Sequence, residues 1–100
     1  DVTAIVTTNN QLPDSFILSQ NYPNPFNPNT KISFSIPKAS FVRLTVYDIR
    51  GKEVEVLVNE NLKAGSFEAD FNASGLTSGV YFCRIQAGEF TDVKKMILVK

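Results

Sequence analysis

Hydrophobic and polar residues alternate along most of the chain beyond residue 30. A period of two is typical of β-strands with one buried face. No helical period of useful length appears, and Leu57 is out of phase with its run. The pattern predicts strands whose apolar positions are Ile32, Phe34 and Ile36; Val42, Leu44 and Val46; Val54, Val56 and Val58; Phe67, Ala69 and Phe71; Tyr81, Cys83 and Ile85; and Met96 with Leu98.

Turn signals separate these runs. Asp48–Gly51 is typical of a type I turn with Gly51 left-handed, and Gly88-Glu89 of a tight hairpin joining the last two strands. Each run has one apolar face, which a second sheet must cover. We therefore predict an all-β fold, an antiparallel β-sandwich of about seven strands. The charges expected on its solvent faces are Lys31, Lys38, Arg43, Glu53, Glu55, Glu68 and Arg84.

The first residues differ in composition from the rest. Thr, Asn and Gln dominate the first eleven, which indicates a linker or a loosely held strand at Thr3–Thr7. The prolines between residues 21 and 30 exclude a helix or a central strand there. We predict a stiff loop anchored by Tyr22 and Phe26, residues 1–15 as a linker from an upstream passenger domain, and residues 16–100 as the folded domain. The start at Asp1 suggests a piece of a longer protein.

Composition narrows the function classes. One hundred residues, 43% of them hydrophobic and with zero net charge, fit one globular domain and not a nucleic-acid-binding protein. No apolar stretch approaches the ~20 residues that a membrane-spanning helix needs. Cys83 is the single cysteine, so no internal disulfide can form, and we expect a buried thiol. We expect a monomer, because no large exposed apolar face is evident.

Catalytic chemistry is poorly represented. There is no histidine, which removes the commonest general base and transition-metal ligand. Glu53 with Glu55, and Glu68 with Asp70, share exposed strand faces where both carboxylates stay solvated. We predict a non-catalytic domain without cofactor or metal. Carbonyl oxygens of the Asn-rich loop at residues 21–29 leave Ca²⁺ open as an alternative.

The last strand, Val93–Lys100, is an apolar run with three lysines and no acid. Termini usually fray, so a strongly strand-like end indicates a segment docked in a sheet. At a sheet edge its backbone could pair with a partner, and its lysines would attract an acidic receptor. An accessory Ig-like or carbohydrate-binding module of a secreted enzyme is the alternative, although the chain has no Trp.

Four stretches resemble the C-terminal sorting domains of the bacterial type IX secretion system. They are Asn21–Pro28 with the strand to Pro37, Val46–Val54, Ala73–Phe82 and Lys94–Lys100, in the family's order. The resemblance implies an Ig-like seven-stranded sandwich that labels a passenger for export. It also implies folding in the periplasm, recognition by the translocon, and in many members removal by a sortase-like surface protease, here within residues 1–15. The protein would then lie at the cell surface or outside the cell. By motif match the recognition residues are Gly79, Val80, Tyr81, Lys94, Lys95, Met96, Leu98 and Lys100.

Overall fold

The computed structural model describes residues 5–7 and 13–100, and within them the chain forms eight β-strands. Six are long and two, β1 and β2, are short. No helix long and apolar enough to cross a membrane occurs in these residues. The strands are β1 (Ile5–Thr7), β2 (Ile17–Leu18), β3 (Asn29–Ile36), β4 (Ser40–Asp48), β5 (Glu53–Leu62), β6 (Gly65–Asn72), β7 (Gly79–Ala87) and β8 (Phe90–Leu98).

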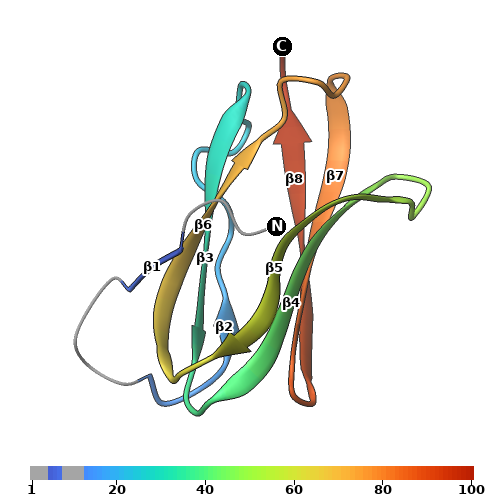
Figure 1. Cartoon of the computed structure of the whole chain (residues 1–100). Coiled ribbons are helices and arrows are strands. Elements are labelled where there is room, and N and C mark those ends of the chain that lie inside the picture. The colour runs from blue at the N-terminus through green and yellow to red at the C-terminus, as the bar shows by residue number, and fades with distance from the viewer. Residues whose placement is uncertain (1–4, 8–12) are drawn as a thin grey trace.

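The strands form two four-stranded sheets that face each other (Figure 1). The first sheet has the order β1-β6-β3-β2 and the second the order β5-β4-β7-β8, with every neighbouring pair antiparallel. The chain passes from one sheet to the other after β3, β5 and β6. The predicted all-β sandwich is confirmed. Most of the predicted linker lies outside the described residues, but Ile5–Thr7 pairs with β6.

The core lies between the sheets and follows the predicted alternation. Ile32, Val42 and Ile85 are almost fully enclosed, and the predicted inward residues of β3, β4, β6, β7 and β8 are all buried, whereas Val54 and Val56 of β5 are only half-buried. The rings of Phe34 and Phe67 stack across β3 and β6 with centroids 5.5 Å apart. Cys83 is 1% exposed, and burial raises its thiol pKa to about 12, so the predicted buried thiol is confirmed.

The predicted strict alternation of buried and exposed residues along β5 is wrong. The register steps from Leu44 opposite Val58 to Thr45 opposite Val56, which leaves Leu57 as an extra residue in a β-bulge. Because the bulge interrupts the alternation, two consecutive residues, Leu57 and Val58, are both buried at 0% exposure. The residue that was out of phase in the sequence is therefore part of the core.

The proline-rich loop is anchored by only one of its two predicted aromatic residues. Phe26 is 2% exposed and packs against Phe71, with ring centroids 6.0 Å apart. Tyr22 is 81% exposed, so its predicted anchoring role is wrong. The Tyr22 backbone forms hydrogen bonds with Lys31, but its ring points to solvent. The buried side chain at this point of the loop is that of Asn21, which is 3% exposed. The Asn21 Nδ2 donates to Thr30 Oγ1 at 3.0 Å and to the Pro23 carbonyl at 3.1 Å.

Candidate recognition surface

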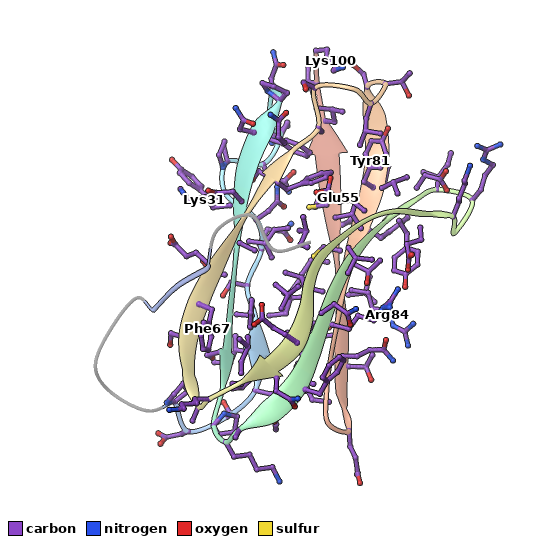
Figure 2. The ribbon with its side chains drawn as sticks, in the orientation of Figure 1. Lys31, Glu55, Phe67, Tyr81, Arg84 and Lys100 are labelled. Atoms are coloured by element: carbon purple, nitrogen blue, oxygen red, sulfur yellow. The ribbon has the colours of Figure 1, made fainter. Side chains whose placement is uncertain are left out.

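Three stretches far apart in the sequence meet at the end of the sandwich where β8 finishes. We call this end the C-terminal rim and define it as residues 48–52, 73–80 and 99–100. The register places Asp48 opposite Tyr81, and Gly79 opposite Leu98. Figure 2 shows Tyr81 and Lys100 toward this end of the molecule. A small pocket of 200 Å³ lies between the 48–50 turn and residues 77–81.

The turn of the rim is held by Asp48. Its Oδ1 accepts hydrogen bonds from the backbone N–H of Lys52 at 3.0 Å and of Arg50 at 2.9 Å. These bonds, with that from Lys52 the larger cause, lower the pKa of the Asp48 carboxyl below its usual value. Gly51 has φ 84°, and its N–H donates to the Asp48 carbonyl, as predicted for this turn. The turn leaves Ile49 70% exposed.

The last residue is tied to the loop between β6 and β7. The Lys100 N–H donates to Ser78 Oγ at 3.0 Å, and its Nζ donates to the Ser74 carbonyl at 2.7 Å. The Tyr81 hydroxyl donates to the Thr77 carbonyl of the same loop at 2.7 Å. Three hydrogen bonds therefore tie Lys100 and Tyr81 to this loop, and the Lys100 ammonium is engaged within the domain.

The structure separates the predicted recognition residues into enclosed and accessible ones. Met96, Leu98 and Tyr81 are 0%, 1% and 6% exposed. Gly79, Lys95 and Lys100 are exposed, and Val80 and Lys94 are half-buried. Gly79 has φ 153°, a backbone conformation that residues other than glycine rarely adopt. Direct contact with another molecule is thus open to the lysines, Gly79 and Val80, while the other three shape the strands beneath.

Strand β8 lies at the edge of its sheet, beside β7 only, as Figure 1 shows. Part of its outer edge is covered by the proline-rich loop, which the sequence pattern did not predict. The Phe26 N–H donates to the Ile97 carbonyl at 2.9 Å, and the Phe26 carbonyl accepts from the Val99 N–H at 3.0 Å. Asn24 Oδ1 accepts from the Ile97 N–H at 2.9 Å. We call this contact the edge cover.

Gln20 extends the edge cover by one residue. Its Nε2 donates to the Lys95 carbonyl at 2.7 Å. The other outward backbone groups of β8 are those of Thr91 and Val93 and the N–H of Lys95. Among the described residues, a hydrogen bond is found for one of them, from the Val93 N–H to the side chain of Asp92 at 2.8 Å. Beside this open part, Asp92 and Lys94 lie in the inward phase and approach each other at 3.9 Å. Inward-pointing charges on an edge strand discourage unwanted strand pairing.

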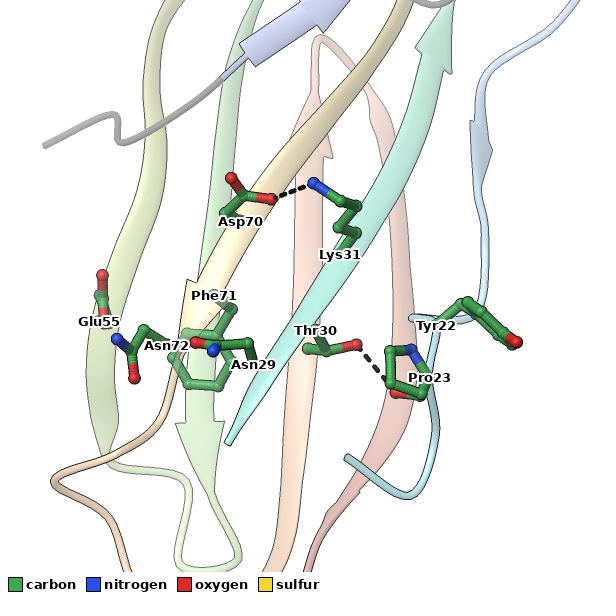
Figure 3. Close-up of a pocket in the computed structure, with 9 residues that line it drawn as sticks. All are labelled: Tyr22, Pro23, Asn29, Thr30, Lys31, Glu55, Asp70, Phe71 and Asn72. Atoms are coloured by element: carbon green, nitrogen blue, oxygen red, sulfur yellow. Dashed lines mark hydrogen bonds and ion pairs between the residues drawn. The ribbon is translucent and has the colours of Figure 1, made fainter. Parts of the chain in front are cut away.

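A larger pocket is lined mainly by the proline-rich loop, β3 and β6, and it reaches Asn72, the residue before the rim (Figure 3). It has a volume of 740 Å³ and extends from Tyr22 and Pro23 to Glu55. Within it the Lys31 Nζ and an Asp70 carboxylate oxygen are 2.8 Å apart, and this hydrogen bond raises the pKa of Lys31. Among the described residues, no group of three or more His, Cys, Asp or Glu is placed to hold a metal ion.

Residues 20–100 match the model of a protein family described as the secretion system C-terminal sorting domain. The match spans the edge cover, the turn at Asp48, the loop before β7 and the whole of β8. No curated protein matches the chain significantly.

Proposed function

The chain belongs to the family of secretion system C-terminal sorting domains, and we propose that its signal is read from the folded C-terminal rim and β8. A domain of this family is the sorting signal of type IX secretion and directs export toward the cell surface or the extracellular space. The family is a sorting-signal family and not a catalytic one. The observation that carries the proposal is the convergence of three family stretches on one end of the sandwich.

The remaining steps of export belong to the same proposal. The domain labels a passenger joined to its N-terminal side, stays folded in the periplasm and is recognised there by the translocon. A sortase-like surface protease then cuts within residues 1–15. Support for this order comes from packing: β8 contributes Met96 and Leu98 to the core, so the signal exists in its present shape only after the domain has folded.

The accessible predicted residues take the contact roles. Lys95 is exposed on β8 and takes part in none of the ion pairs among the described residues, so its charge is available to an acidic receptor. Lys100 acts through its backbone and side-chain bonds to Ser78 and Ser74, which position the rim. Met96, Leu98 and Tyr81 act by supporting the strands.

Pairing of a receptor strand with β8 is limited by the edge cover. Ile97 and Val99 already use their outward groups on Asn24 and Phe26. An added strand could pair with β8 at Thr91 and Val93 without displacing the edge cover, although the Val93 N–H would have to exchange its bond to Asp92. Pairing along the whole strand would require the proline-rich loop to be displaced from the edge of β8.

The test is export of a passenger fusion that lacks Val93–Lys100. We expect surface delivery to be lost. Because the deletion also removes core side chains, a matched control is Ile32→Ala, which weakens the core in β3 and leaves β8 and the rim intact. Export of the control at a temperature where both proteins are folded, with no export of the truncated fusion, supports the proposal. Normal export of the truncated fusion contradicts it.

One observation favours a second function, a carbohydrate-binding module. The exposed Tyr22 ring lies at one end of the 740 Å³ pocket, and aromatic rings commonly stack on sugars. Figure 3 shows this ring at the opposite end of the pocket from Glu55. Binding to insoluble polysaccharides that is abolished by Tyr22→Ala, together with export that survives loss of β8, would favour this function over sorting.

A further inference from the structure

The outer faces of the two sheets differ in chemistry. On the first sheet, β3 and β6 present only polar side chains to solvent, namely Lys31, Ser33, Ser35, Ser66, Glu68 and Asp70. On the second sheet, the outward positions of β7 and β8 include Val80, Phe82, Val93 and Ile97. Solvent-facing positions of an antiparallel sheet are ordinarily polar, as the first sheet illustrates. Strands β7 and β8 therefore depart from the pattern that β3 and β6 follow.

The apolar positions are contiguous. The register places Val80 beside Ile97, Phe82 beside Lys95, and Arg84 beside Val93. These six residues form what we call the outer patch. Tyr47 extends it onto β4, where it lies opposite Phe82. Val93 is 48% exposed, so the outer patch presents apolar atoms directly to solvent. Figure 2 shows Arg84 on the side of the sandwich opposite to Lys31.

The charge of the outer patch is positive. The described residues form ion pairs between Lys31 and Asp70, Arg43 and Glu53, Arg50 and Asp48, and Lys94 and Asp92. Neither Arg84 nor Lys95 belongs to any of them. Two cations that form no ion pair among the described residues thus lie within an apolar surface. Protein interfaces commonly combine aromatic residues and Arg in this way.

We propose that the outer patch docks on an apolar, carboxylate-bearing protein surface of the type IX machinery; this inference rests on the sorting function proposed above. Complementary carboxylates would pair with Arg84 and Lys95 while Phe82 and Ile97 lose contact with water. A second copy of the chain does not fit as well. A two-fold interface through this face would bring the same cations toward one another.

The experiment measures export of a passenger fused to the full chain. Arg84→Glu combined with Lys95→Glu reverses the charge of the outer patch. Lys38→Glu combined with Lys63→Glu changes the net charge equally, in the loops at the opposite end of the sandwich. We expect the first pair to lower the surface-delivered fraction at least about tenfold, because like charges facing each other oppose association. The second pair should leave it unchanged.

A second comparison tests the apolar component. Val93→Thr with Ile97→Thr makes the β8 part of the outer patch polar while keeping β-branched side chains in that strand. Ile17→Thr with Phe41→Thr alters residues that are 48% and 50% exposed outside the patch. Only the first pair should reduce export. The thermal midpoint of each variant is recorded, so that loss of folding is recognised.

The outcomes separate the two proposals. No export of the unaltered fusion overturns the sorting function itself. Export of the parent and of all four variants alike, or equal loss in patch and control variants, overturns the outer patch as the docking site. Loss that disappears once a variant is assayed below its thermal midpoint also overturns it, because stability then explains the effect. Sedimentation that reveals a dimer dependent on Arg84 and Lys95 would overturn the proposed occupant in favour of a second copy.

Discussion

Replacing Leu98 by Ala tests whether the last strand is part of the core. Leu98 is 1% exposed, and the substitution removes three buried carbons, a loss of about 2.4 kcal/mol at about 0.8 kcal/mol for each. The cavity left behind raises the expected cost to about 3 kcal/mol. For a domain of this size, that cost lowers the thermal midpoint by about 12 to 24 °C.

The assay is thermal and urea unfolding of the wild type, of Leu98→Ala and of Val99→Ala. Val99 is next in sequence but 50% exposed, and its backbone bond to Phe26 does not depend on the side chain. Its substitution should change the free energy of unfolding by no more than about 0.5 kcal/mol. Equal effects of the two substitutions would refute the docking of β8 in the sandwich.

The Cys83 thiol, with its pKa raised to about 12 by burial, should resist thiol reagents in the folded protein and react only on unfolding; fast native-state labelling would contradict this. Asn24→Ala should remove the acceptor of the Ile97 N–H, cost about 1 kcal/mol and accelerate hydrogen exchange at that amide, and unchanged exchange would exclude the bond. Because the folded pKa of Asp48 is lowered, its stabilising contribution is present above the unfolded value of 3.8 and is lost as the pH falls below it, so Asp48→Asn should flatten the acid limb of a stability–pH profile.

The sequence predicted the parts of the fold that depend on local pattern. The alternation of Ile32, Phe34 and Ile36 predicted one buried face, and each of the three is at most 2% exposed. The turn at Asp48–Gly51 and the hairpin at Gly88-Glu89 were readable because left-handed backbone favours glycine; both glycines have positive φ.

Features that depend on register or on distant segments could not be predicted in this way. The bulge at Leu57 shifts the phase of β5 by one residue; the sequence showed Leu57 out of phase, but a two-residue period does not say how the pairing with β4 changes there. The exposure of Tyr22 depends on Asn21 taking the buried place beside Thr30. The edge cover joins distant parts of the chain, because Asn24 and Ile97 are separated by 73 positions in the sequence.

The candidate site was predicted in part, and by resemblance more than by physical pattern. Motif similarity singled out Gly79 and the final lysines without separating Met96 from Lys95. The alternation placed Met96 on the apolar face and Lys95 on the polar one, and their burial confirms this. The outer patch was missed because outward apolar positions such as Phe82 and Ile97 look unremarkable until the register places them side by side.

The central claim is that this folded domain is itself sufficient to address a passenger for type IX export. The most direct measurement attaches residues 1–100 to the C-terminus of an unrelated periplasmic reporter in a host that has the type IX system, and follows where the reporter accumulates. We expect delivery to the cell surface or the medium in cells with a functional translocon, and retention in the periplasm when the translocon is disabled. A reporter that stays in the periplasm with the folded domain attached would contradict it.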